Sequence, residues 1–213
     1  MNDETTNTEG FRWFQALAMA AEFGEDHLVD HLLRVSAYTV LIAKGVGMNT
    51  QDLERLRVAS LLHDVGKSGV PLEHLRKPGE LNKMERYIVE HHTHIGYELI
   101  YQSEKILADV PHPIDRETWQ MAKEVALLHH ENWDGTGYPE MRRQQEIPFY
   151  ARVVRIADTL DALQTDRVYK AAWPWEHVVA EIEAKKGKAF DPILAQWVIE
   201  NQDNFMRGVS DEP

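Results

Sequence analysis

A histidine and an aspartate stand side by side at the end of an apolar stretch of this chain. The residues Ala-Ser-Leu-Leu precede His63 and Asp64, and Gly66 and Lys67 follow them. A charged aspartate is costly in an apolar environment unless it is paired or coordinates a metal ion. An ordinary helix-end aspartate beside a partly exposed histidine would also explain the pair, because most such residues lie at the surface. The pair alone is therefore suggestive of metal chemistry and no more.

Two other apolar, helix-like segments carry the same residue types. His31 follows His27 by four residues, so both side chains project from one helical face. A single histidine on such a face is usually a hydrogen-bonded core residue, which is how His31 reads by itself. Asp158 and Asp161 lie one turn apart in a helix-like run rich in apolar residues. Two carboxylates on so apolar a segment require a partner.

Histidines also end two further apolar segments. His92 lies in a run with two other histidines that cannot all face inward, and its face includes apolar residues, so we favour it as the inward one. His129 and His130 close another apolar stretch. The adjacent Glu131 is expected to orient one of the histidines, although a solvated glutamate at a helix end explains it nearly as well.

Each of these residues has a harmless explanation, but together they suggest a metal centre. Imidazole and carboxylate ligands suit divalent transition metals such as Fe, Mn or Zn. The set is too large for one tetrahedral ion and large enough for two ions that share a bridging carboxylate. The candidate ligands are His31, His63, Asp64, His92, His129, His130 and Asp158.

The elements that must position these side chains are predicted to be helices. No segment alternates cleanly between apolar and polar residues, so we expect no sheet. The fold class is all-α, with a flexible tail over residues 1–10 and one compact multi-helix domain over residues 11–213, which holds the metal centre in its helical core. Helices are expected over 11–23, 26–44, 50–63, 82–99, 116–130 and 148–164, with two more starting at Pro174 and at Asp191-Pro192.

Length and composition limit the function. The chain has 213 residues, 43% of them hydrophobic, and no cysteine, which fits one large domain and excludes thiolate metal sites and disulfides. The polar, acidic first residues resemble no secretory signal and no run is long enough to span a membrane, so we expect a cytoplasmic protein without a membrane partner. The net charge of −12 argues against a nucleic-acid polymer as substrate.

These motifs resemble a known family. The pair His63-Asp64 followed by Lys67, with an earlier histidine and a later aspartate, resembles the HD superfamily of metal-dependent phosphohydrolases. The loop from His129 to Pro139, HHENWDGTGYP, is similar to the signature of its HD-GYP branch, and the later DTLDALQTDRVYK matches the continuation of that branch. The resemblance runs from about Asp26 to Pro192. The HD pair has low specificity, whereas the loop signature in this order is very specific.

The resemblance implies a function and a role for several residues. Family members cleave cyclic di-GMP, a bacterial second messenger, to pGpG or on to GMP. By motif position all the candidate ligands carry over as metal ligands, with Asp64 as the bridge, and Lys67 lies near the scissile phosphate. The expected cofactors are two divalent ions, Fe or Mn, which activate water and stabilise charge on the phosphoryl oxygens. Positions that contact the substrate in family members match Tyr138, Arg167 and Lys170.

One position departs from the family pattern. Members with three metal ions have glutamate four residues before the helical histidine, where this chain has His27. Either His27 supplies a nitrogen ligand to a third ion or the third site is absent, and we favour the two-metal centre. This departure leaves the final product open.

Three alternatives to cyclic di-GMP hydrolysis remain at the level of sequence. The nearest is an HD phosphohydrolase that acts on another nucleotide, such as a hybrid cyclic dinucleotide. A second is a catalytically silent domain that binds a cyclic dinucleotide or a signalling protein; the complete ligand set and Lys67 argue against it. A third, a metal-dependent redox enzyme on a helical scaffold, is disfavoured by the loop signature.

Overall fold

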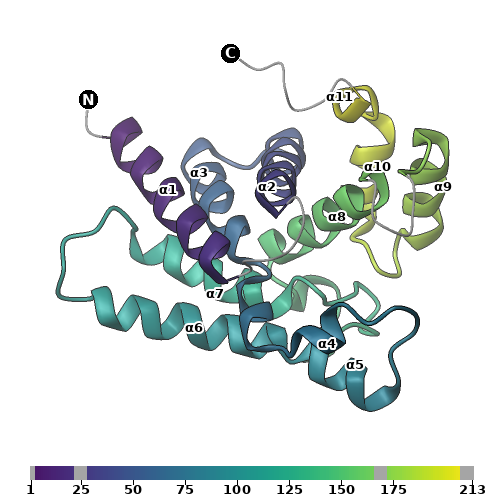
Figure 1. Cartoon of the computed structure of the whole chain (residues 1–213). Helices are drawn as coiled ribbons and strands as arrows, with labels where there is room; N and C mark the ends of the chain where they lie inside the picture. The colour runs from purple at the N-terminus through teal and green to yellow at the C-terminus, as the bar shows by residue number, and fades with distance from the viewer. Residues whose placement is uncertain (1–2, 22–27, 166–171, 207–213) are drawn as a thin grey trace.

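A computed structural model of the chain describes residues 3–21, 28–165 and 172–206, and over these residues it is helical (Figure 1). Within these described ranges there is no strand, and one isolated bridge joins Lys186 and Phe190. The predicted all-α fold is therefore confirmed. The elements are α1 (Asp3–Ala21), α2 (Leu28–Gly45), α3 (Thr50–Ala59), η1 (Ser60–Leu62), η2 (Val65–Gly69), α4 (Leu72–Leu75), α5 (Lys83–Glu90), α6 (His92–Leu107), α7 (Arg116–Leu128), η3 (Gln144–Glu146), α8 (Phe149–Gln164), α9 (Trp175–Lys185), α10 (Pro192–Glu200) and α11 (Asp203–Met206).

Two helices depart from the predicted boundaries. α1 begins at Asp3, so residues 3–10, which the sequence assigned to a flexible tail, are helical. The helix predicted over 82–99 is two helices: α5 ends at Glu90, His91 separates them, and α6 continues to Leu107. This break makes His92 the first residue of α6.

Local signals explain where several helices begin. The Asn82 side chain accepts hydrogen bonds from the backbone N–H groups of Met84 and Glu85, and the Glu85 side chain accepts one from the Asn82 N–H. This capping box accounts for the helix start expected at position 82. At α3 the cap is Asn49, which accepts from the Asp52 N–H.

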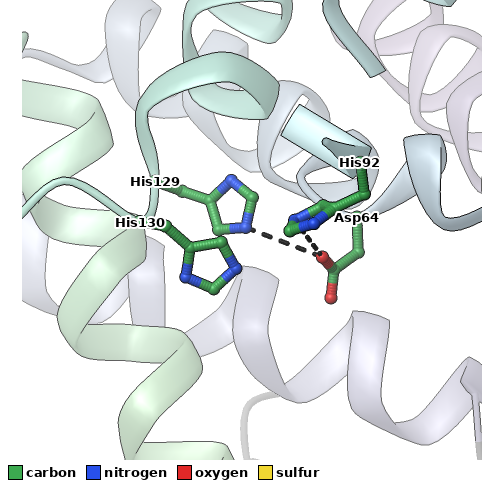
Figure 2. A group of neighbouring side chains, drawn as sticks. All are labelled: Asp64, His92, His129 and His130. Atoms are coloured by element: carbon green, nitrogen blue, oxygen red, sulfur yellow. Dashed lines mark ion pairs between the residues drawn. The ribbon is translucent and has the colours of Figure 1, made fainter. Parts of the chain in front are cut away.

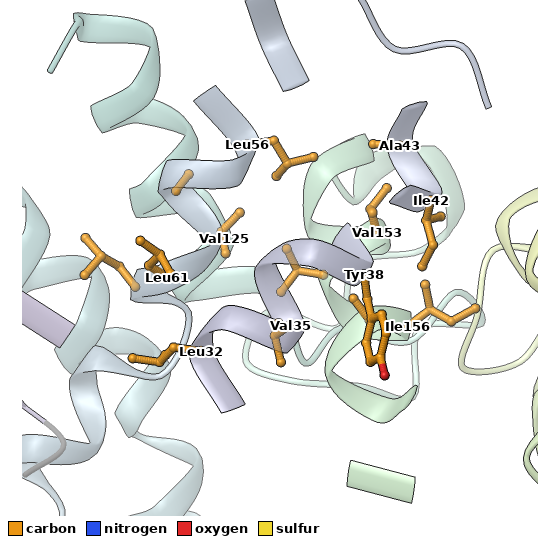
Figure 3. Close-up of a cluster of buried hydrophobic side chains, with 14 of the residues drawn as sticks. Leu32, Val35, Tyr38, Ile42, Ala43, Leu56, Leu61, Val125, Val153 and Ile156 are labelled. Atoms are coloured by element: carbon orange, nitrogen blue, oxygen red, sulfur yellow. The ribbon is translucent and has the colours of Figure 1, made fainter. Parts of the chain in front are cut away.

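The core forms where α2, α3, α7 and α8 meet (Figure 3). Leu32, Val35 and Ile42 on α2 are at most 1% exposed, and Val125 on α7 and Ile156 on α8 are fully buried. Each such side chain contributes about 1.5–3 kcal/mol when it is buried. This shared core fixes the helices relative to one another and so fixes whatever side chains project from their ends.

The candidate ligands come from five places along this framework. His31 lies on α2, the pair His63-Asp64 lies between η1 and η2, and His92 begins α6. His129 and His130 follow α7, which packs against α6 (Figure 1), and Asp158 lies on α8. In the described part of the chain no helix has the length and apolar character needed to cross a membrane.

Candidate metal centre

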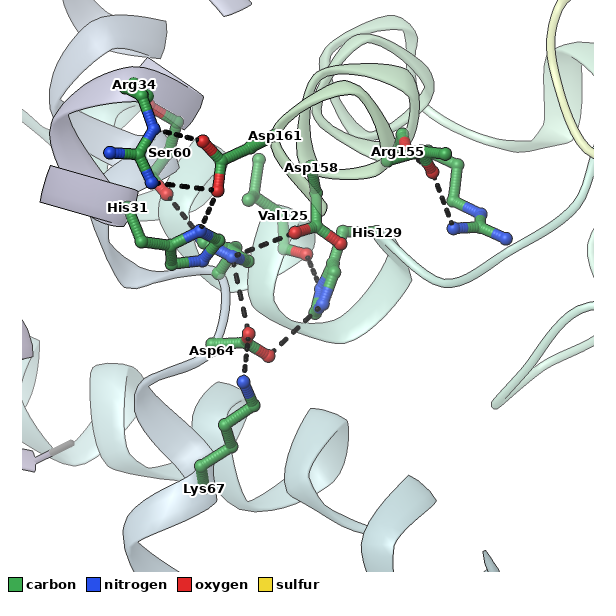
Figure 4. A network of polar contacts seen from close by, with 12 residues as sticks. His31, Arg34, Ser60, Asp64, Lys67, Val125, His129, Arg155, Asp158 and Asp161 are labelled. Atoms are coloured by element: carbon green, nitrogen blue, oxygen red, sulfur yellow. Dashed lines mark hydrogen bonds and ion pairs between the residues drawn. The ribbon is translucent and has the colours of Figure 1, made fainter. Parts of the chain in front are cut away.

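The carboxylate of Asp64 lies at the centre of the histidine cluster and turns one oxygen to each side (Figures 2 and 4). Its Oδ1 is 3.3 Å from His92 Nε2 and 3.6 Å from His129 Nε2. Its Oδ2 is 3.4 Å from His63 Nε2 and 2.7 Å from Lys67 Nζ. A carboxylate whose two oxygens face two separate groups of nitrogen atoms has the arrangement of a bridging ligand.

The three nearest histidines are each oriented by the backbone of the preceding helical turn. The Nδ1 atoms of His63, His92 and His129 lie 2.9, 2.7 and 3.0 Å from the carbonyl oxygens of Ser60, Val89 and Val125. A carbonyl can only accept, so Nδ1 carries the proton in each ring. The lone pair is therefore on Nε2, the atom that points at Asp64, which is how metal-ligating histidines are usually held.

Three of the atoms that point into the cluster have no hydrogen-bond partner. The Nε2 atoms of His92 and His129 and the Oδ1 atom of Asp64 are buried and unpaired. A buried polar atom without a partner costs about 1–3 kcal/mol. Three such atoms aimed at one another are explained if a divalent metal ion binds between them, and nitrogen and carboxylate donors fit that chemistry.

His130 completes the group on the Oδ1 side of Asp64. Donor atoms of Asp64, His92, His129 and His130 all lie within 4.8 Å of one another. Burial lowers the pKa of His129 and holds the pKa of His130 well below its ordinary value. Both rings are therefore neutral at neutral pH and have lone pairs to offer a metal ion.

A second group forms on the Oδ2 side. Donor atoms of His31, His63 and Asp64 also lie within 4.8 Å of one another, and Asp158 Oδ1 is 4.0 Å from His63 Nε2. The structure thus brings together every candidate ligand that it describes. His27, Arg167 and Lys170 lie outside the described residues.

Lys67 lies against the central carboxylate. Burial alone would raise the pKa of Asp64, but Lys67 and His63 outweigh that effect and hold the pKa well below its ordinary value. Asp64 is therefore a carboxylate, the form a metal ion binds. Lys67 is partly exposed, with 24% of its side chain accessible, so its ammonium can reach a bound anion from the edge of the cluster.

The residues that support His31 were not predicted from the sequence. His31 Nδ1 lies 2.7 Å from Asp161 Oδ2, and Asp161 also accepts from the Arg34 guanidinium (Figure 4). The two carboxylates on α8 therefore have different partners: Asp158 faces the ligands, and Asp161 orients His31. Arg34 is three residues after His31 on α2, and this spacing was the signal that could have identified the partner of Asp161.

Glu131 supports the loop rather than a histidine. Its carboxylate is 1% exposed, and its Oε1 accepts a hydrogen bond of 2.7 Å from the Glu140 N–H. The expectation that Glu131 orients a ligand is therefore wrong. Within the same loop, Tyr138 stacks on His130, with ring centroids 4.8 Å apart. Glu131 thus fixes the segment that places an aromatic ring against a candidate ligand.

Two glycines let backbone segments of the centre approach closely. A Cβ atom at Gly66 would lie 1.9 Å from the carbonyl oxygen of His92, and one at Gly137 would lie 2.5 Å from that of His130. Both neighbours are rigid backbone, so only glycine fits at either position. The absence of a side chain at Gly66 thus lets the segment after Asp64 contact the start of α6.

Comparisons with known proteins agree with this geometry. A family model described as "HD domain" matches residues 15–194. The chain is 36% identical over 190 residues to a 3'3'-cGAMP-specific phosphodiesterase of Vibrio cholerae, covering 89% of this chain and 34% of that protein. It is 35% identical over 186 residues to a cyclic di-GMP phosphodiesterase of Thermotoga maritima, covering 87% of this chain and 48% of that protein.

The fold is also that of a solved structure. Bd1817, described as an HDG"Y"P protein from Bdellovibrio bacteriovorus, superimposes with a TM-score of 0.65 at 18% identity, covering 95% of this chain and 65% of that one. At this identity the likeness concerns the fold alone. The chain spans about a third to a half of the length of the two curated relatives described above, 34% and 48%.

Proposed function

The chain belongs to the HD-domain family and to its HD-GYP branch, and from that premise we propose that it is a metal-dependent phosphodiesterase that hydrolyses cyclic di-GMP to pGpG or on to GMP. The observation that carries the proposal is the Asp64 carboxylate, whose oxygens face two groups of imidazoles, with the buried Nε2 atoms of His92 and His129 unpaired on one side. A pair of metal ions in such a site is suited to in-line displacement at phosphorus.

We propose that the centre holds two divalent ions, Fe or Mn. One ion would be held by Asp64, His92, His129 and His130, and the other by His31, His63, Asp64 and Asp158. Bound there, the ions would supply an activated water and stabilise charge on the phosphoryl oxygens. If His27 adds a third site, the protein would bind one further ion.

The remaining residues of the proposal act on the substrate. The Lys67 ammonium can donate a hydrogen bond to a phosphoryl oxygen, or a proton to the departing sugar oxygen, because it lies at the edge of the cluster beside Asp64. Tyr138, which is partly buried and stacked on His130, is proposed to contact a base of the substrate. Arg167 and Lys170 are proposed to hold the phosphate that does not react.

A hybrid cyclic dinucleotide is the second candidate substrate. The observation that favours it is the 36% identity with a relative named as specific for 3'3'-cGAMP. The two substrates differ in one purine base, so the metal centre would serve both and the walls of the site would decide between them. A silent domain that binds a cyclic dinucleotide or a signalling protein would show binding without turnover.

The test is an anaerobic turnover assay with protein reconstituted with Fe(II) or Mn(II). Wild type, Asp64→Ala and the control Asp109→Ala, which changes an exposed aspartate after α6, are incubated with cyclic di-GMP and with 3'3'-cGAMP, and products are separated by chromatography. We expect conversion by wild type and control, and loss of both metal and turnover in Asp64→Ala, because a bridging ligand serves both ions. Turnover and metal content unchanged in Asp64→Ala would contradict the two-metal centre, and bound metal without turnover in wild type would favour the silent domain.

A further inference from the structure

Arg155 is a cation on α8 that lies beside the metal centre and forms no ion pair within the described residues. It precedes Asp158 by three residues, so the two side chains leave α8 about one turn apart (Figure 4). Its Nε and Nη2 atoms lie 3.4 and 3.2 Å from Asn132 Oδ1, and its Nη1 atom lies 3.3 Å from Thr159 Oγ1. All of its hydrogen-bond acceptors are therefore neutral, and the contacts are at or beyond the long end of the usual range.

Two other partly buried arginines near the centre, Arg152 and Arg34, are paired with carboxylates. Arg152, one turn earlier on the same helix, pairs with Asp191 and donates to the Ile147 carbonyl oxygen at 3.0 Å. Arg34 pairs with Asp161 in the same way. A partly buried cation without a carboxylate is costly unless something else supplies the negative charge.

The surroundings of Arg155 indicate where that charge would come from. Asn132 begins the loop directly after Glu131, and the same loop brings Tyr138 onto His130. Burial lowers the pKa of Arg155, and the negative charge of Asp158 acts in the opposite direction. Burial, the other histidines and, more weakly, Arg155 lower the pKa of His130. The guanidinium is therefore close enough to affect the centre electrostatically, although it contacts none of its ligands.

We propose that Arg155 is a substrate-contacting residue that binds a phosphate group of the cyclic dinucleotide other than the one at the metal ions. This inference rests on the proposed function and goes beyond the motif positions discussed above. Binding would exchange long hydrogen bonds to an amide and a hydroxyl for charge-assisted bonds to a phosphate, which are about twice as strong as neutral ones. The planar guanidinium is suited to two oxygens of one phosphate.

The experiment compares wild type with Arg155→Met, which removes the charge and keeps an unbranched apolar stem beside Phe190, whose ring centroid is 5.9 Å from the guanidinium carbon. Arg155→Lys keeps the positive charge but lacks the planar guanidinium with its paired N–H donors. The control Arg116→Met removes one exposed arginine from the first turn of α7, at the far end of that helix from His129. Metal content, kcat and KM are measured with cyclic di-GMP and with bis(p-nitrophenyl) phosphate, a diester with a single phosphate.

We expect Arg155→Met to raise KM for cyclic di-GMP about tenfold or more, as loss of a hydrogen bond to a charged group does. Metal content, kcat and hydrolysis of bis(p-nitrophenyl) phosphate should be unchanged, Arg155→Lys should be intermediate, and Arg116→Met should match wild type. A KM unchanged in Arg155→Met, or equal losses on both substrates, would overturn the inference, because the single-phosphate diester cannot use a second phosphate contact.

A binding measurement separates this inference from the proposed function. Equilibrium binding of cyclic di-GMP to wild type and Arg155→Met is measured by calorimetry under the same metal conditions. If wild type binds without turnover, the proposed hydrolysis is wrong, and a dissociation constant raised about tenfold in Arg155→Met would still support the phosphate contact. An unchanged constant, or no binding by wild type, would overturn it.

Discussion

The two ends of helix α7 treat polar groups in opposite ways. At its start the Asp115 carboxylate accepts hydrogen bonds from the Thr118 N–H at 2.7 Å and the Thr118 hydroxyl at 2.6 Å, and pairs with Arg55 at 2.8 Å. At its end His129 is fully buried, and its Nε2 has no hydrogen-bond partner. The chain itself completes the first arrangement and leaves the second incomplete.

This difference separates groups that stabilise the fold from groups that serve the site. The capping contacts at Asp115 lower the free energy of the folded chain in any solution near neutral pH. The unpaired atoms around Asp64 raise it by an amount that a bound metal ion can more than offset. Substitutions at the two ends should therefore affect stability and metal binding in opposite ways.

The largest expected effect is that of His129→Leu on metal binding. Removing one ligand from the Oδ1 side of Asp64 should lower metal content and reduce turnover more than about 100-fold, by analogy with the cost of losing even the supporting partners of a ligand. The free energy of unfolding of the metal-free variant should be at most about 1 kcal/mol below that of metal-free wild type, or above it, because an unpaired buried nitrogen is replaced by an apolar group. Metal analysis and urea unfolding with chelator check both parts. Full metal content in the variant would show that His129 is not a metal ligand.

The next effect is the stabilisation of wild type by metal. Ions that bind only the folded chain should raise the free energy of unfolding by about 2.7 kcal/mol per site when the free ion is at 100 times its dissociation constant. Thermal unfolding with Mn(II), and again with chelator, measures this shift. The metal-induced rise in the free energy of unfolding should be reduced or absent in His129→Leu and as large as in wild type in Asp115→Ala. Equal shifts in both variants would mean that the ion binds elsewhere.

The residues of the metal centre were easier to predict from the sequence than the residues that position them. His63, Asp64 and His92 could be selected because polar groups on apolar helical faces need a reason to be there. Their common position around Asp64 depends on the packing of α2, α6, α7 and α8, which no local pattern encodes. Glu131 was assigned to a histidine because the two are neighbours in sequence, whereas its carboxylate binds the backbone of Glu140 across the loop.

The helix boundaries show the same limit. The start of α5 was predictable, since the Asn82 capping box is a local signal within four residues. The break at His91 was not, because the apolar spacing continues through it, and the contact of α6 with α7 joins residues distant in sequence. The close contact of Gly66 with His92 was not predictable for the same reason, because it joins residues distant in sequence.

A smaller effect is expected from Asp115→Ala at the start of α7. Loss of the N-cap should lower the free energy of unfolding by about 1 kcal/mol. Metal content and kcat should match wild type, because the cap is about 20 Å from His129 along a helix that rises 1.5 Å per residue. Urea unfolding and the turnover assay measure the two quantities. A loss of metal in this variant would show that the two ends of α7 are coupled.

The smallest effect is the pH dependence of this cap. Burial alone would raise the pKa of Asp115, but hydrogen bonds from Thr118 and Arg55 outweigh it and hold the pKa below its ordinary value. The folded state therefore binds this proton less readily than the unfolded state, so the stabilisation is complete above the unfolded pKa, about 4, and is lost as the pH falls through the lower folded value.

Because 45% of the side chain is exposed, we expect Asp115→Asn to cost less than about 1 kcal/mol at pH 7. Urea unfolding of metal-free wild type and variant should give a difference that is constant from pH 7 to about 5 and shrinks below about 4. A difference that stays constant down to the acid end would mean that the charge of Asp115 contributes nothing and that its oxygen alone caps α7.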